Sequence, residues 1–182
     1  MVIAETRAWL EHAVIGLNLC PFAKAVVARQ QVRFATSAAA DRPALQASLV
    51  DELVLLTAAD PAEVDTTLLI CPMALPDFDD YNQFLDVAEA TLRAMDLEGV
   101  IQVASFHPHY RFAGTEAGDV TNASNRSPYP MLHLLREDSV ARALAAFANP
   151  EAIYTANMRT LQALGEEGWK NLEASWSGVR KT

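Results

Sequence analysis

The sequence predicts an α/β fold with a small, three-stranded, at least partly parallel sheet flanked by several helices. Helical and strand-like segments alternate through residues 1–106, which is the signature of α/β architecture. The strand candidates are residues 31–36, 66–71 and 100–106, which are short, apolar or alternating, and bounded by turn signals. A ferredoxin-like α+β layout is the alternative, because periodicity does not separate the two.

Apolar residues recur at helical spacing between and after these strand candidates. The expected helices cover residues 4–19, 43–59 and 78–95. A further helix is expected from Ser127 to Phe147, because serine at the N-cap followed by proline is a strong helix start. Asn149-Pro150-Glu151 repeats this pattern and predicts a last helix.

The chain of 182 residues is expected to form a single domain over 1–182, with one well-buried core. Its last part, residues 166–182, carries Trp169 and Trp176 at a wide helical spacing. These two side chains predict that the tail docks at least partly on the body, although part of it could be less ordered.

Composition excludes several classes of protein. A net charge of −9 argues against nucleic acid and anionic membranes as partners, since both need clustered Lys and Arg. No apolar run is long enough to span a bilayer. Glu5 and Arg7 stand where a secretory signal would need an apolar run, so we expect a cytoplasmic protein. Two cysteines are too few for a disulfide framework.

The segment from His107 to Ser127 has neither helical nor strand periodicity. A loop of this length is uncommon in a compact domain and usually indicates function or disorder. Disorder fits poorly, because several aromatic side chains would be left in water. We therefore expect the functional part of the chain in residues 106–137.

This window is cationic in a chain that is acidic overall. From Phe106 to Arg136 the basic residues are His107, His109, His133, Arg111, Arg126 and Arg136, against only Glu116 and Asp119. Such a reversal suits a carboxylate or a phosphate, and the start of the expected helix at Ser127 would add free backbone N–H groups. The sequence thus predicts a pocket for a small anionic molecule.

Roles in that pocket follow from residue chemistry. His107 or His109 would act as general acid/base, Arg111 and Arg126 would bind the anion, and Tyr110 would orient it. The other candidate ligand-binding residues are Asn125, Ser127, Tyr129 and Arg136. The alternatives are a binding or regulatory protein without chemistry and a protein-interaction module.

Both cysteines precede a proline. Cys20 is expected at the cap of a restarting helix, where the helix dipole would lower its pKa, and could contribute to catalysis from the opposite wall. Cys71 ends the second strand candidate, so a parallel sheet would place it at the same edge as His107. A buried structural role is the alternative for both thiols.

A metal site is a further alternative. His107 and His109 flank a proline and would point to one side of an extended chain. His133 and Glu137 would share one face of the expected helix. Together they could bind zinc or iron, although no established metal motif is present.

Two stretches carry a family resemblance. Residues 9–22 (WLEHAVIGLNLCPF) and 106–137 (FHPHYRFAG…NRSPYPMLHLLRE) resemble the bacterial domain of unknown function 1415 family. The resemblance covers essentially the whole chain. It implies a small cytoplasmic protein of a family without an established activity, so it transfers no catalytic residues.

Overall fold

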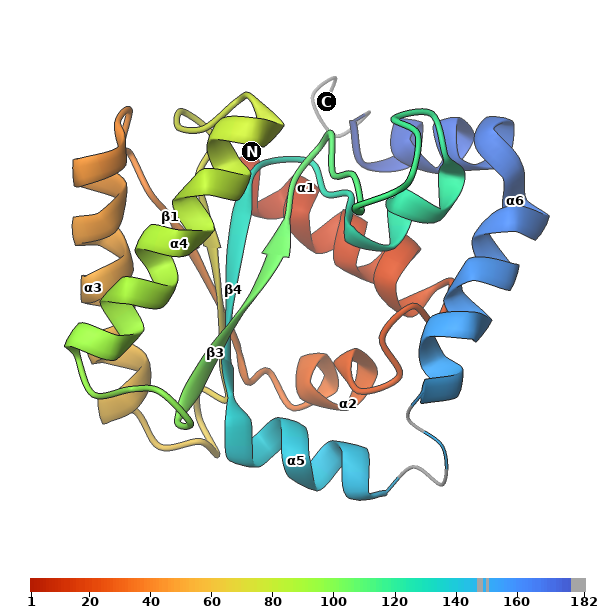
Figure 1. Ribbon diagram of the computed structural model, residues 1–182. Helices are drawn as coiled ribbons and strands as arrows, with labels where there is room; N and C mark the ends of the chain where they lie inside the picture. Colours follow the sequence, from red (N-terminus) through yellow and green to blue (C-terminus); the bar gives the residue numbers. More distant parts are fainter. Residues whose placement is uncertain (147–148, 150, 178–182) are drawn as a thin grey trace.

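A four-stranded mixed sheet lies at the centre of the computed structural model, which describes residues 1–146, 149 and 151–177 (Figure 1). Its strands are β1 (Val32–Thr36), β2 (Thr66–Ile70), β3 (Ile101–Phe106) and β4 (Met131–Arg136). They lie in the order β1-β2-β4-β3. β1 is parallel to β2, and β4 is antiparallel to both of its neighbours. The three strands predicted from the sequence therefore run in one direction, with a fourth inserted between two of them.

The prediction of a helix from Ser127 is wrong, and so is the prediction of three strands, because residues 131–136 form β4. β4 is covered on both faces, and Met131, Leu132 and Leu134 are almost fully buried. A strand buried on both faces loses the alternation that identifies strands, and its apolar residues also fit helical spacing. The Ser127 hydroxyl donates to the Tyr129 carbonyl (2.6 Å) instead of capping a helix. Helix α5 (Glu137–Ala145) begins only after the strand.

Helices α3 (Arg42–Ala58) and α4 (Phe78–Ala94) cover one face of the sheet (Figure 1). Each begins at an aspartate, Asp41 or Asp77, whose carboxylate accepts backbone N–H groups of the first turn. Four leucines of α3 lie at helical spacing and are completely buried against the sheet: Leu45, Leu49, Leu53 and Leu56. The helices predicted at 43–59 and 78–95 are confirmed.

The other face is covered by α1 (Val2–Trp9), the π-helix η1 (Leu10–Ile15), α2 (Ala23–Ala28) and α6 (Glu151–Ser177). Helices on both faces distinguish this α/β sheet from the α+β alternative, in which helices are segregated to one face. Trp169 and Trp176 of α6 are buried in the same apolar cluster as Trp9. The predicted positions Phe147, Pro150 and 178–182 lie outside the described residues. Within the described chain, no helix combines the length and apolarity needed to cross a membrane.

Tyr81 of α4 joins the helix to the end of the β3–β4 pair. Its hydroxyl donates to the Met131 carbonyl (2.6 Å) and accepts the Phe106 N–H (3.0 Å), and the side chain is buried. Desolvation raises the pKa of this phenol far above its usual value. The hydroxyl therefore stays protonated and fixes the point where the long loop leaves the sheet.

Replacing Tyr81 with phenylalanine is expected to lower the free energy of unfolding by about 2 kcal/mol, because it leaves a buried N–H and a buried carbonyl without a partner. Urea unfolding followed by circular dichroism measures the change. Tyr154→Phe is the control, since Tyr154 is exposed and should tolerate the substitution. Equal stability of the two variants would contradict this role of the Tyr81 hydroxyl.

Candidate ligand cavity

The three arginines predicted to bind an anion point to different parts of the molecule. Arg111 is exposed and forms an ion pair with Asp79 (3.8 Å). Arg126 donates from Nη2 to the Ala117 carbonyl (2.6 Å). Arg136 lies opposite Ile101 at the start of β3, whereas His107 follows the end of that strand. Five residues along a strand separate these ends by about 17 Å. The structure therefore places Arg136 at the far end of β3 from His107.

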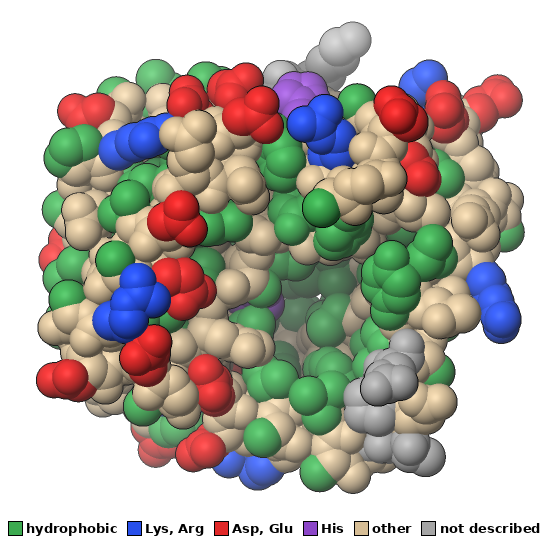
Figure 2. Space-filling model, viewed as in Figure 1, with side chains coloured by type: hydrophobic (Ala, Val, Ile, Leu, Met, Phe, Trp, Pro, Cys, Tyr) green, Lys and Arg blue, Asp and Glu red, His purple; other side chains and the backbone are tan. Residues whose placement is uncertain are grey.

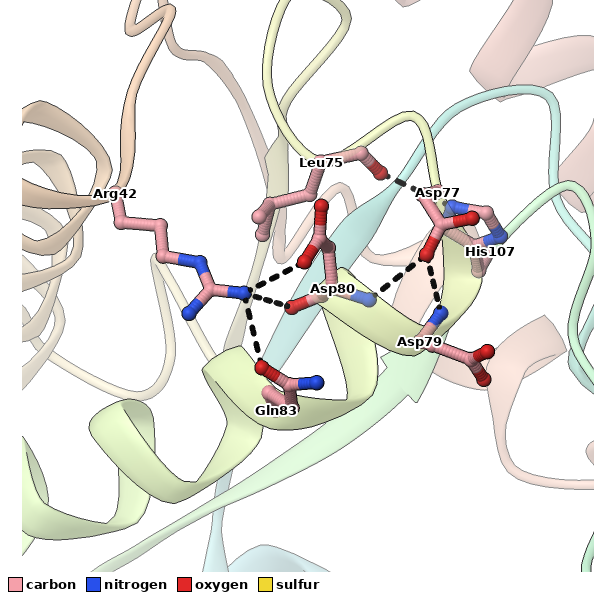
Figure 3. A network of polar contacts seen from close by, with 7 residues as sticks. All are labelled: Arg42, Leu75, Asp77, Asp79, Asp80, Gln83 and His107. Atoms are coloured by element: carbon pink, nitrogen blue, oxygen red, sulfur yellow. Dashed lines mark hydrogen bonds and ion pairs between the residues drawn. The ribbon is translucent and has the colours of Figure 1, made fainter.

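His107 is a fully buried histidine with both ring nitrogens in use. The backbone N–H of His109 donates to Nδ1 (3.0 Å), and Nε2 lies 3.1 Å from the Leu75 carbonyl (Figure 3). These partners assign the Nε2–H tautomer. Burial lowers the pKa of His107, so the ring is neutral at pH 7. Neither nitrogen is left to exchange a proton with a ligand.

Figure 3 shows what surrounds His107 at the start of α4. The Asp77 carboxylate is occupied by the N–H groups of Asp79 and Asp80, and Arg42 binds Asp80. His109, the other predicted acid/base, is exposed on the surface. This edge of the sheet is held together by helix capping and by paired side chains.

Of the histidines proposed as metal ligands, His107 and His109 lie together, with ring centroids 5.8 Å apart, but His133 lies on the opposite face of the sheet from His107. His107 packs against Phe78 and Tyr81 of α4, while His133 faces Phe106 on the other side. Glu137 begins α5, so the helix face that it was expected to share with His133 does not exist. Among the residues that the structure describes, no three His, Cys, Asp or Glu side chains form a group that could hold a metal.

Other predicted ligand-binding residues hold the loop in place. The Tyr110 hydroxyl is 3.2 Å from Ser105 Oγ, and the Asn125 amide donates to the Ser105 carbonyl (3.0 Å). Tyr129 donates from its hydroxyl to the buried carboxylate of Glu5. The loop that had no periodicity is thus ordered by side-chain hydrogen bonds, and it contains the short 3₁₀ helix η2 (Val120–Asn125).

A two-chambered cavity opens on the face of the sheet away from α3 and α4. The outer chamber has a volume of about 440 Å³ and lies between η1, η2 and α6. The inner chamber, about 270 Å³, lies over the sheet between η1, α2 and α5. Val14, Cys20 and Phe106 line both chambers, which therefore adjoin. Figure 2 shows the hollow in this face, with mainly hydrophobic side chains around it.

The cavity wall is almost free of charge. No Asp, Glu, Lys or Arg is among the described residues lining the outer chamber, and the inner chamber has only Asp65 and Arg136. Asp65 accepts a hydrogen bond from Ser139 Oγ (2.6 Å), and Arg136 donates to backbone carbonyls. The sheet forms the floor of the inner chamber, and apolar residues of α2 and α5 form its walls: Ala23, Val26, Val27, Val140 and Ala143.

His133 is the histidine of the inner chamber. Its Nε2 lies 2.7 Å from Thr66 Oγ1, and that hydroxyl donates to the Leu134 carbonyl (2.7 Å). Because the one hydroxyl proton is used there, Oγ1 must accept from His133, which carries its proton on Nε2. Nδ1 is then an acceptor without a partner among the described residues. Burial lowers the pKa of His133 to about 4, so the ring is neutral.

The two thiols differ sharply in access. Cys71 follows β2 at the edge predicted for it, but it is buried on the α3–α4 side, and desolvation raises its pKa to about 12. Cys20 is half-buried where the two chambers meet. It does not cap a helix as expected, because α2 begins at Ala23 with Phe22 as its N-cap. Cys20 is therefore a side chain of the cavity wall, contributed by a loop.

Sequence reasoning missed the cavity, although one signal was present. The stretch 9–22 contains the π-helix η1, whose Leu10 and Val14 line the inner chamber. A Cβ at Gly16 would collide with the His12 carbonyl oxygen, so this irregular helix end requires glycine. π-Helical turns are frequent at functional sites. The same stretch also carries one of the two family motifs.

A family model described as "Protein of unknown function (DUF1415)" matches residues 1–171. The chain belongs to this family, as the two motifs predicted. A search of curated proteins and a search of solved structures found no match to this chain.

Proposed function

We propose that this member of the DUF1415 family binds a small, uncharged and largely apolar molecule in the two-chambered cavity. The observation that carries the proposal is the cavity itself, a mainly apolar space on the face of the sheet away from α3 and α4, whose chambers meet at Cys20. Concave, mainly apolar sites with a few polar groups are typical of small-molecule binding. Filling such a space with an apolar ligand removes both surfaces from water.

The geometry favours this binding role over an enzyme acting on an anion. Each arginine from which the anion pocket was predicted has a protein partner, and so does Asp65, the carboxylate of the cavity wall. A buried anion needs paired charge or several hydrogen-bond donors. His107, the first candidate acid/base, has both nitrogens occupied. The cavity supports binding without requiring chemistry.

Binding of N-phenyl-1-naphthylamine, a neutral apolar probe that becomes fluorescent in apolar surroundings, tests the proposal. The wild-type protein is expected to bind it at one saturable site. Ala143→Leu adds bulk to the wall of the inner chamber and should weaken binding about tenfold, since overpacking costs on the order of 1–3 kcal/mol. Ala141→Leu, at an exposed position of the same helix, is the matched control.

Cys20 provides a second readout in the same experiment. Bound probe should slow the alkylation of Cys20 by N-ethylmaleimide, while the buried Cys71 stays unreactive with or without probe. Cys20→Ser identifies the reacting thiol. Absence of saturable binding, or equal affinity of the two leucine variants, would refute the cavity as the site. Preferential binding of small dicarboxylates or phosphate would instead support the anion pocket.

A further inference from the structure

We infer that the inner chamber selects ligands with a neutral hydrogen-bond donor, such as an alcohol, a phenol or an N–H group, and binds that donor at Nδ1 of His133. This inference rests on the proposed function and specifies the class of ligand. It predicts that an alcohol binds better than its methyl ether or than the corresponding carboxylate.

The direction of the hydrogen bonds fixes His133 as an acceptor. The Leu134 carbonyl takes the proton of Thr66, Thr66 takes the proton on Nε2 of His133, and Nδ1 keeps its lone pair. Thr66 is almost fully buried and lies on β2, next to the strand that carries His133. The relay is therefore part of the sheet, and the acceptor is oriented before a ligand binds.

The accessible part of the His133 ring faces the inner chamber. The side chain is half-buried and belongs to a central strand, β4. It lies on the cavity face of the sheet, where Thr66, Leu68 and Ala104 also line the chamber. An acceptor left unpaired in an apolar space costs free energy, which a donor from the ligand recovers. An ether has no proton to give and leaves that cost unchanged.

Charge discriminates against acids at the same place. A carboxylate would bring only lone pairs to a neutral imidazole acceptor. The chamber also holds Asp65, and the guanidinium of Arg136 is already bonded to the Leu56, Ala59 and Val64 carbonyls. Nε and Nη2 of Arg136 are thus already used, and a ligand anion would lose its hydration beside the Asp65 carboxylate. The chamber should reject the acid more strongly than the ether.

Gln102 is a second polar side chain on the floor of this chamber, and its amide has no hydrogen-bond partner among the described residues. It lies on β3 opposite Leu135, two residue pairs from the pair that Ala104 makes with His133. An amide both donates and accepts, so it would not separate an alcohol from an ether as strictly as Nδ1 does. Substituting Gln102 therefore tests whether the preference comes from His133.

Three ligands with the same ring system test the inference: 1-naphthol, 1-methoxynaphthalene and 1-naphthoate. The wild-type protein should bind 1-naphthol about tenfold more tightly than the ether, as one net hydrogen bond provides, and 1-naphthoate most weakly. His133→Phe should abolish the preference between phenol and ether. Thr66→Val should reduce it and Thr66→Ser should retain it, because serine preserves the relay. Gln102→Leu should leave it unchanged.

A spectroscopic readout on the wild-type protein covers the case in which His133→Phe does not fold. The ¹⁵N resonance of His133 Nδ1 should shift with 1-naphthol and stay in place with 1-methoxynaphthalene. Equal affinity for the phenol and the ether would overturn the inference and leave the binding proposal standing. Preference for 1-naphthoate would overturn it in favour of an anion site. If none of the three ligands binds, both the inference and the proposed function fail.

Discussion

Replacing Arg136 with methionine should lower the free energy of unfolding by about 3 kcal/mol, because hydrogen bonds from charged donors contribute on the order of 1.5–3 kcal/mol each. The guanidinium donates to the Leu56 and Ala59 carbonyls at the end of α3 and to the Val64 carbonyl just before β2. It supplies a cation at the negative end of the helix and joins α3 to β4. Urea unfolding followed by circular dichroism measures the loss.

Two further variants define this effect. Arg136→Lys keeps the charge but not the planar set of donors, so it should recover only part of the stability. Arg29→Met, at an exposed arginine, controls for the loss of a positive charge from an acidic protein. If Arg136→Met and Arg29→Met cost the same, the bonds to the helix end contribute nothing specific.

Acidification from pH 6.5 towards pH 4 should destabilise the protein through His133. The free energy of unfolding should fall by about 3 kcal/mol over this whole pH interval. Burial lowers the pKa of His133 to about 4 in the folded protein, whereas the ordinary pKa of a histidine side chain is 6.5. The unfolded chain therefore binds a proton in this window that the folded chain does not. The stability due to neutral His133 is fully present above pH 6.5 and is lost as the pH falls towards 4.

The measurement compares unfolding free energies of wild type and His133→Gln from pH 7.5 to 4.5. The wild-type curve should fall more steeply, because glutamine does not titrate. His12→Gln, at an exposed histidine, should follow the wild-type curve. The pKa of His107 is also lowered, so His107→Gln should flatten the curve in the same direction. Parallel curves for wild type and His133→Gln would show that His133 does not keep its neutral form through burial.

The sequence identified the elements whose periodicity reflects one buried face or a strand bounded by turn signals. The leucines of α3 are an example, since Leu45 to Leu56 lie at helical spacing and are all buried. β4 was missed because the signal for a strand is alternation, and burial on both faces removes it. Ser127-Pro128 then matched the start of a helix, and local sequence gave no reason to reject that match.

The candidate site was harder to predict, for a geometric reason. Basic residues close in sequence were expected to converge, but residues 107 and 136 lie at opposite ends of the β3–β4 pair. The cavity is instead assembled from distant segments, such as Val14, Cys20 and Phe106, whose proximity only the fold establishes. The sequence predicts His133 only as a metal ligand. Its hydrogen bond to Thr66 could not be predicted, because Thr66 lies in another strand.

The place of β4 in the sheet has a consequence for how the chain is made. β4 is the last strand in the sequence, yet it lies between β2 and β3 and pairs with both. During synthesis, β1 and β2 can pair early, but β3 has no neighbour until residue 136 has emerged. A nascent chain of 130 residues therefore carries two unfilled strand edges, which are sites for mispairing and chaperone binding. Completion of the sheet and formation of the cavity floor are then the same late event.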